Sequence, residues 1–182
     1  KAKKQVAGDR FADLIADVRK DSTIKAVVLR VNSPGGSVVA SSKIKTELDL
    51  LRESVPVIAS YGNYAASGGY WISANTDKIF SNATTLTGSI GVFSMIPDVS
   101  GALKNKLHVN VTTVNSNAHS DLYSLIKPLD AAETAYMQAS VENIYERFTS
   151  IVADGRDMTV EAVDAIAQGR VWTGAEAEGI GL

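Results

Sequence analysis

The sequence predicts an α/β fold with a mainly parallel sheet. Short apolar runs rich in β-branched residues alternate with amphipathic stretches along the 182 residues, as strands alternate with helices in such folds. Small-residue segments follow two of the expected strands, where a turn into a helix is needed. The chain has no internal repeat, linker or low-complexity tract, and its length fits one core. We therefore predict a single domain over residues 1–182.

The first half of the chain contains two strand–turn–helix units. The run from Ile24 to Val31 is short and mostly apolar, which is typical of a buried strand. In the stretch that follows, Ile44, Leu48 and Leu51 are spaced to share one helical face. The expected elements are a helix over 9–20, a strand over 24–31, a helix over 38–53, a strand over 56–61 and a short helix starting near Ser67.

The second half continues the alternation with shorter strands. Thr159 precedes Glu161 and Asp164, as an N-cap residue precedes an acidic first turn. The expected elements are strands over 78–81, 90–94 and 109–114, a long helix over 131–154 and a short helix capped by Thr159.

Composition excludes several classes of function. The formal net charge is -2, so no basic face is expected for nucleic acid or an anionic membrane. Without cysteine the chain has no disulfide, thiol nucleophile or zinc–thiolate site. We find no metal-ligand constellation and no phosphate-binding motif, and predict no cofactor. No apolar run reaches membrane-spanning length, and the first residue is not Met, so we expect a segment of a longer chain.

Two loops offer the groups that acyl transfer requires. Asn32 to Gly36 and Tyr64 to Tyr70 each follow a strand, where ligands bind in parallel α/β folds. Ser67 supplies a hydroxyl, and glycines let a carbonyl approach backbone N–H groups that stabilise an oxyanion. The N–H groups of Gly68 and Gly35 are the expected donors. Each loop also has a plainer interpretation, because Gly-Gly is often only a turn and a serine at a helix start is often only an N-cap.

The residues of these loops resemble a known family. The motifs are Val31-Asn32-Ser33-Pro34-Gly35-Gly36-Ser37, Ala65-Ala66-Ser67-Gly68-Gly69-Tyr70-Trp71-Ile72-Ser73, Leu86-Thr87-Gly88-Ser89-Ile90-Gly91 and Ala167-Gln168-Gly169-Arg170-Val171-Trp172-Thr173-Gly174. Together they are similar to signal peptide peptidase A, of the protease IV type, over nearly the whole chain. The resemblance implies the Clp protease/crotonase fold, a twisted sheet wrapped by helices. It also implies Ser67 as nucleophile, with the Gly68 and Gly35 amides as oxyanion hole.

The same resemblance implies a Ser–Lys dyad in which Ser89 orients the lysine. In single-domain members that lysine lies in a loop resembling Ala118 to Asp121, and Ser120 stands at its position here. In two-domain members it comes from the amino-terminal half, and this chain resembles the carboxy-terminal half. Either the lysine is supplied from outside this segment, or Ser120 replaces it through an engineered change. Within the chain, Lys127 is interpreted as a structural cation and His119, with Asp121, as a weaker candidate base.

The resemblance further implies a role, a location and partners. The expected activity is endopeptidase degradation of residual, apolar signal peptides at the bacterial cytoplasmic membrane, with the catalytic domain on the extracytoplasmic (periplasmic) side. Homo-oligomers and a membrane-associated segment outside this chain are also expected. Two rivals stay open, a catalytically silent assembly half and a crotonase-type acyl-CoA hydratase or isomerase. The latter needs glutamates at the glycine loops, where this chain has Ser67.

Overall fold

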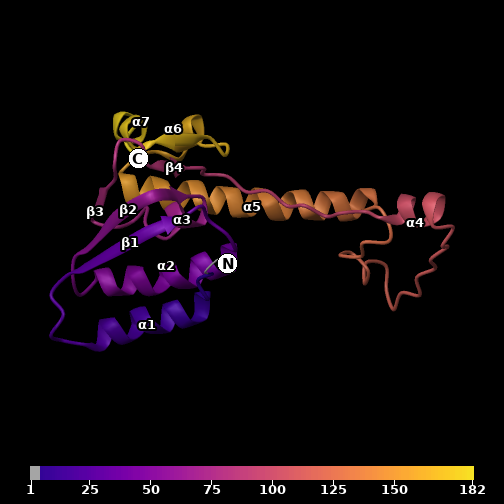
Figure 1. The fold of residues 1–182 in the computed structure, drawn as a ribbon, viewed down its shortest axis with the longest axis horizontal. Helices are drawn as coiled ribbons and strands as arrows, with labels where there is room; N and C mark the ends of the chain where they lie inside the picture. The colour runs from indigo at the N-terminus through magenta and orange to yellow at the C-terminus, as the bar shows by residue number, and fades with distance from the viewer. Residues whose placement is uncertain (1–4) are drawn as a thin grey trace. The chain divides into compact units, whose positions relative to one another are not determined.

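The computed structural model describes residues 5–182, which form two compact units (Figure 1). Within the described residues, unit 1 comprises 5–91 and Tyr145–Leu182, and unit 2 comprises Val92–Ile144. The division concerns contacts within the chain, so the single domain predicted over 1–182 stays a prediction. Along residues 5–182 no helix combines the length and apolarity needed to cross a bilayer.

Unit 1 is built on a mainly parallel sheet, which confirms the predicted fold class. Its strands are β1 (Val27–Ser33), β2 (Val57–Ala66), β3 (Lys78–Phe80), β4 (Leu86–Gly88) and β5 (Val171–Thr173). The order is β1-β2-β4-β5, and β3 also pairs with β2. The first half of β2 pairs with β3 and its end with β4, all in parallel, while β5 runs antiparallel to β4. Because β1 and β2 also pair in parallel, their ends lie side by side.

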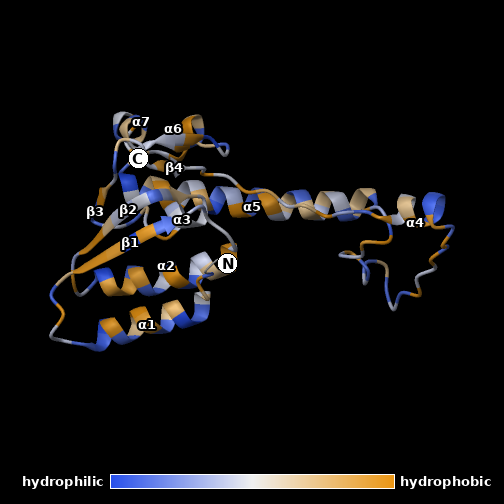
Figure 2. Ribbon diagram, in the orientation of Figure 1, coloured by the Kyte–Doolittle hydropathy of each residue, from blue (hydrophilic) through white to orange (hydrophobic). Residues whose placement is uncertain are grey.

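The helices of unit 1 follow the predicted patterns. They are α1 (Gly8–Lys20), α2 (Val38–Arg52), α3 (Gly68–Trp71), α6 (Val160–Ile166), α7 (Gly174–Gly179) and the part of α5 (Ala131–Arg156) from Tyr145. Ser37 caps α2 by accepting a bond from the Ala40 N–H, and Ile44, Leu48 and Leu51 are buried as predicted. Thr159 caps α6 by accepting from the Ala162 N–H. Figure 2 shows alternating hydrophobic and hydrophilic colour along α1 and α2, as amphipathic helices require.

The core of unit 1 joins the sheet to α3 and to the end of α5. Trp71 on α3 is buried, and its ring centroid lies 4.7 Å from that of Phe148 on α5. Gly155 allows the close approach, since a Cβ there would lie 2.3 Å from the Ala74 carbonyl oxygen. Arg156 then donates to the carbonyl oxygens of Ala74 and Thr76. The end of α5 thus packs against α3 and the turn that follows it.

Several sequence predictions of strands were wrong. The segments 90–94 and 109–114 are irregular, and the strand nearest the first of them is β4, which ends at Gly88. β4 was missed because its pattern is polar, yet Thr87 is buried and donates its hydroxyl to the Ala65 carbonyl oxygen. Apolar content alone does not make a strand without a partner for its backbone. The sequence reasoning also did not predict α4 (Ser100–Lys106), β5 or α7.

Unit 2 contains α4 and the first part of α5. The start of α5 carries a reciprocal cap, in which the Glu133 N–H donates to Asp130 Oδ1 and the Asp130 N–H donates to Glu133 Oε2, at 2.8 and 3.0 Å. Between Leu107 and Asp130 the chain is mostly turn and irregular structure. Local hydrogen bonds, rather than a sheet, organise this unit.

Candidate active site

Ser67 stands where β2 ends and α3 begins. It occupies the N-cap position of α3 with φ 50° and ψ -121°, an unfavourable conformation for a residue with a Cβ, and its side chain makes no capping bond. Its N–H donates to the Gly88 carbonyl oxygen at 2.9 Å, and its carbonyl oxygen accepts from the Trp71 N–H at 2.8 Å. The backbone is fixed on both sides while the hydroxyl is left out of the cap. Ser67 thus occupies the N-cap position without making the side-chain bond that the plainer interpretation as an N-cap would expect.

The two glycine loops meet at this serine. Gly35 has φ +109°, and a Cβ built on it would lie 2.7 Å from Ser67 Cβ and 2.8 Å from Gly68 N. Such distances are shorter than real Cβ atoms allow, so only glycine fits at position 35 without a shift. The structure thus brings Gly35, Ser67 and Gly68 together from two segments more than 30 residues apart in sequence.

The backbone amides around Ser67 differ in their present partners. The Gly35 N–H donates to Ser33 Oγ at 3.2 Å. Among the hydrogen bonds of residues 5–182, none has the Gly68 N–H or the Gly36 N–H as donor. Gly36 lies close by, because a Cβ on Gly68 would be 3.1 Å from Gly36 N. The sequence reasoning did not single out Gly36, although the paired glycines were the available signal.

The end of β4 connects Ser89 to the backbone of Ser67. The Gly88 carbonyl that accepts from Ser67 belongs to the peptide unit joining Gly88 to Ser89. Ser89 itself has φ 47°, and its N–H donates to the Arg170 carbonyl oxygen at 2.7 Å. The hydrogen bonds within the described part of the chain involve neither Ser67 Oγ nor Ser89 Oγ. Both residues are partly exposed.

Another serine, which the sequence reasoning missed, lies close to Gly68. Ser41 on α2 is buried, and a Cβ built on Gly68 would lie 2.6 Å from its Oγ. Its place on the buried face of α2, one turn before Ile44, was the only sequence signal. Ser41 therefore limits the space beside Gly68 to a residue without a Cβ.

The tyrosines nearest the site act as core residues rather than as bases. Tyr70 and Trp71 are buried, whereas Tyr64 is half exposed. Burial raises the pKa of Tyr61 and the pKa of Tyr70 far above the ordinary value, so both phenols stay neutral. Tyr61 is hydrogen-bonded to Ser73 Oγ at 2.8 Å.

Within unit 2, Lys127 is a structural cation, as the sequence reasoning interpreted it. Its ammonium lies 2.8 Å from Asp121 Oδ1 and 2.8 Å from Glu133 Oε1. Hydrogen bonds to Asp121 and then Glu133 raise the pKa of Lys127 to about 12, so it stays charged at neutral pH. A charged ammonium cannot accept the proton of a serine hydroxyl.

The other candidate bases of unit 2 also have different partners from those expected. His119 Nδ1 lies 3.5 Å from Glu133 and 4.0 Å from Asp130, while the carboxylate of Asp121 pairs with Lys127. The His119–Asp121 pairing that a triad would need is therefore absent within unit 2. Ser120 is exposed, and its hydroxyl donates to the Asn117 carbonyl oxygen at 3.3 Å.

Three side chains of unit 2 have the spacing of a possible metal site, although the sequence analysis predicted no set of metal ligands. Ligand atoms of His119, Asp130 and Glu133 lie within 4.8 Å of one another. Two of the three residues are exposed, and the Lys127 ammonium already neutralises Glu133 at 2.8 Å. The same carboxylate also accepts the Asp130 N–H. The group therefore fits an ion-pair and helix-cap network, and we assign no metal to it.

The fold and the place of the site define a class of protein. The chain superposes on a mutant of ClpP1 from Listeria monocytogenes with a TM-score of 0.61, covering 96% of this chain and 80% of that one at 14% identity. At this identity the likeness shows the fold, and it confirms the predicted Clp protease architecture. The sequence then gives the family. Residues 49–182 match the profile of peptidase family S49, and the chain belongs to that family.

Individual relatives are similar in sequence to nearly the whole of this chain. Protease 4 of Salmonella typhi is 47% identical over 178 residues, which is 97% of this chain and 28% of that protein. Protease 4 of Haemophilus influenzae is 41% identical over 96% of this chain and 28% of its own length. A protein of Enterococcus faecium provisionally named signal peptide peptidase SppA is 37% identical over 100% of this chain and 53% of its own. The chain thus spans about half or less of these relatives.

Proposed function

We propose that this chain is the nucleophile-bearing part of a serine endopeptidase, with Ser67 as the nucleophile. The observation that carries the proposal is the contact of two separate loops at one serine, where Gly35 leaves no room for a Cβ beside Ser67. Ser67 has a strained backbone, and its hydroxyl makes no capping hydrogen bond. A serine that served only a turn or a helix cap would need neither feature. Membership of peptidase family S49 supports the same chemistry.

The reaction follows from the groups around the serine. Ser67 Oγ attacks the scissile carbonyl carbon as its proton passes to a general base, and the carbonyl oxygen becomes an oxyanion. The N–H groups of Gly68 and Gly35 stabilise that charge, and the Gly36 N–H is a further donor at the same place. Collapse of the tetrahedral intermediate expels the amine, which takes up the proton, and leaves an acyl-enzyme. Water then attacks the ester and regenerates Ser67.

We propose that the general base is a lysine outside residues 1–182, oriented in part by the Ser89 hydroxyl. A free lysine has a pKa of about 10.4, so a base lysine must be desolvated to be neutral near pH 7. Lys127 has the opposite environment, with two carboxylates at 2.8 Å. Lys43 pairs with Asp9, and Lys45 lies 2.5 Å from Asp49. These ion pairs favour the charged form of Lys127, Lys43 and Lys45, so none of the three is a favourable general base.

The proposed substrates are apolar, extended signal peptides left in or beside a bacterial cytoplasmic membrane, on the extracytoplasmic side. The support is the family resemblance and the name of the Enterococcus relative. The membrane attachment belongs to other parts of the whole protein. A silent assembly half is disfavoured because an assembly surface has no need of an oxyanion site. A crotonase-type enzyme is disfavoured because Ser67 occupies the place where a catalytic carboxylate is needed.

Covalent labelling tests the nucleophile. A serine-reactive phosphonate should modify the full-length protein at Ser67, and Ser67→Ala should abolish both the label and peptide hydrolysis. The matched control is Ser150→Ala on the exposed face of α5, which should change neither. Label at another serine, or unchanged hydrolysis by Ser67→Ala, would overturn the assignment. Binding of an acyl-CoA thioester without phosphonate labelling would favour the crotonase rival.

A further inference from the structure

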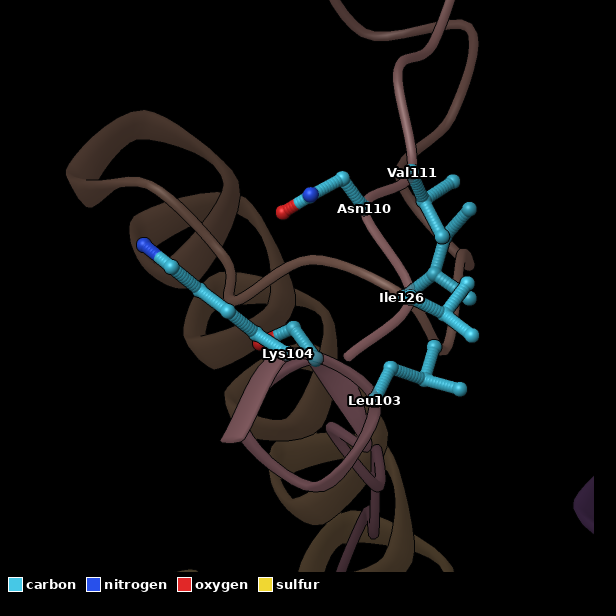
Figure 3. A pocket seen from close by; sticks show the side chains of 7 residues that line it. Leu103, Lys104, Asn110, Val111 and Ile126 are labelled. Carbon is cyan, nitrogen blue, oxygen red and sulfur yellow. The ribbon is translucent and has the colours of Figure 1, made fainter. Parts of the chain in front are cut away.

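Two places in the chain combine polar side chains with irregular backbone. In unit 2, a cavity of about 220 Å³ has hydrophobic residues on one side and Asn110 and Lys104 on the other (Figure 3). Among the hydrogen bonds of residues 5–182, none involves the side chain of Asn110 or of Lys104. In unit 1, by contrast, the Asn32 side chain makes two hydrogen bonds to the backbone of β2. Fixed polar geometry is therefore found at Asn32 and not in the cavity.

β2 carries a bulge opposite Asn32. Tyr61 pairs with Val31, and Ala65 pairs with Ser33. Three residues of β2 thus stand opposite one residue of β1, Asn32, so β2 carries two extra residues at this point. The alternation of buried and less buried side chains along β2 breaks at the same place. Bulges bend the strand that contains them and occur often beside active sites, where they redirect a side chain.

Side chains from both sides hold the bulge. Asn32 Oδ1 accepts from the Asn63 N–H at 2.9 Å and from the Tyr64 N–H at 3.2 Å. On the other side, Thr85 is buried just before β4 and donates its hydroxyl to the Gly62 carbonyl oxygen at 2.7 Å. A bulge interrupts the regular ladder of backbone hydrogen bonds, so these side chains act as partners for the backbone groups of β2.

Gly62 leaves the space that the Asn32 side chain occupies. A Cβ built on Gly62 would lie 2.6 Å from Asn32 Oδ1 and 2.8 Å from Asn32 Cγ. These distances are shorter than real Cβ atoms allow, so a side chain at position 62 would displace the Asn32 amide. The contact between Asn32 and the bulge is therefore close as well as hydrogen-bonded.

The bulge separates two halves of β2. Before it, β2 pairs with β3 as far as Ser60, and after it β2 pairs with β4 from Tyr64. The second half leads directly to Ser67, whose N–H donates to the Gly88 carbonyl oxygen. A strand advances about 3.3 Å per residue, so loss of the two extra residues from the bulge would move Ser67 by about 7 Å along the sheet. The bulge therefore sets the position at which Ser67 meets Gly35.

We infer that Asn32 is a positioning residue for the reaction at Ser67. Its side-chain oxygen holds the bulge of β2 in one conformation, and the bulge in turn keeps Ser67 beside Gly35. Asn32 acts through the backbone of β2 rather than on the reacting atoms. The inference rests on the proposed peptidase activity, and it requires a hydrogen-bond acceptor at position 32.

Two substitutions at position 32 separate the acceptor from the bulk of the side chain. In the full-length protein, Asn32→Leu keeps a side chain of similar length without an acceptor. It should lower kcat for a fluorogenic apolar peptide by about 10- to 100-fold at nearly unchanged KM, because a misplacement of about 1 Å can cost that much. Asn32→Asp keeps an oxygen that accepts both N–H groups and should stay within about threefold of the original kcat. The rate of phosphonate labelling at Ser67 should follow the same order.

The matched control lies two residues earlier on the same strand. Arg30 donates to the Tyr61 carbonyl oxygen at 2.7 Å and to Ser60 Oγ at 2.8 Å. Arg30→Ala therefore also removes hydrogen bonds between β1 and β2, but before the bulge, and it should weaken the fold in urea unfolding without lowering kcat. If Asn32→Leu does not fold, Gly62→Ala displaces the Asn32 oxygen instead and should give the same loss of kcat.

The possible results distinguish the inference from the proposed function. Unchanged kcat in Asn32→Leu contradicts the inference, and so does an equal loss of kcat in Arg30→Ala or in Asn32→Asp. Each of these results leaves the proposed function intact as long as the unsubstituted protein is labelled at Ser67. Absence of that label from the unsubstituted protein would refute the proposed function itself, and the inference with it.

Discussion

At Gly35 the lack of a side chain decides whether Ser67 and Gly68 can approach. The φ of +109° and the 2.7 Å from a built Cβ to Ser67 Cβ are two separate costs of any substitution. Gly68 is constrained in the same way by Ser41 Oγ at 2.6 Å. The absence of a side chain at Gly35 and Gly68 is therefore a requirement of the site's geometry.

Gly35→Ala should reduce kcat/KM by about 100-fold or more, because the methyl group displaces Ser67 and the Gly68 amide from the oxyanion site. The same overpacking should lower the free energy of unfolding by about 1–3 kcal/mol. Steady-state kinetics and urea unfolding measure the two effects. Gly179→Ala is the control, because a Cβ there meets nothing within 4 Å. Unchanged kinetics in Gly35→Ala would show that this loop takes no part in catalysis.

At the scale of elements, short helices depend on their caps. α7 begins with a capping box, in which Thr173 Oγ1 accepts from the Glu176 N–H while Glu176 Oε2 accepts from the Thr173 N–H and hydroxyl. The hydrogen bonds from the Thr173 N–H and then its hydroxyl lower the pKa of Glu176 below its ordinary value of 4.5. Its contribution to stability is therefore present above that value and lost as the pH falls through the lowered pKa.

Thr173→Ala should lower the free energy of unfolding by about 1 kcal/mol at pH 7. The loss should shrink at pH values below the lowered pKa of Glu176, since the protonated carboxyl no longer gains from the Thr173 hydroxyl. Urea unfolding as a function of pH measures both. Thr159→Ala on α6 is the control, because that cap bonds the Ala162 N–H and has no acidic partner at the same position. An equal pH dependence in the two variants would contradict the capping-box account.

At the scale of the whole molecule, the candidate bases of unit 2 are already paired with acidic groups. Lys127 is tied to two carboxylates, and His119 faces acidic groups other than Asp121. The chain also spans about half or less of its relatives in family S49. Catalysis is therefore expected to be a property of the complete protein rather than of this segment.

Residues 1–182 alone should hydrolyse a fluorogenic apolar peptide about 1,000-fold more slowly than the full-length protein, because a positioned general base contributes about 10²–10⁴ in rate. The full-length Ser67→Ala variant sets the background rate. Strong hydrolysis by the segment alone, abolished by Ser67→Ala, would show that the base lies within it. Folding of the segment is verified by circular dichroism before the comparison.

Local patterns were sufficient for much of unit 1. Burial on one helical face at Ile44, Leu48 and Leu51 and the cap at Thr159 are confirmed, because both depend on residues only a few positions apart. β4 and β5, which have three residues each and are defined by their partner strands, were missed, although the equally short β3 was predicted. The segment 109–114 was wrongly predicted as a strand because an apolar, β-branched run on an uncovered surface looks the same as a buried one.

The sequence by itself determined the α/β class, the two glycine loops and the serine they surround, since turn chemistry and periodicity are local and the motifs are specific. Only the tertiary structure decided that Gly35 touches Ser67, that Ser41 and Gly36 lie beside Gly68, and that Lys127 is held by Asp121 and Glu133. The contacts around Ser67 and Gly68 join residues far apart in the chain, whereas Lys127 lies six positions from each of its partners. Sequence spacing does not encode which of these residues touch in the fold. The physical reason is that parallel strands align their ends through backbone pairing, which brings distant loops to one edge of the sheet.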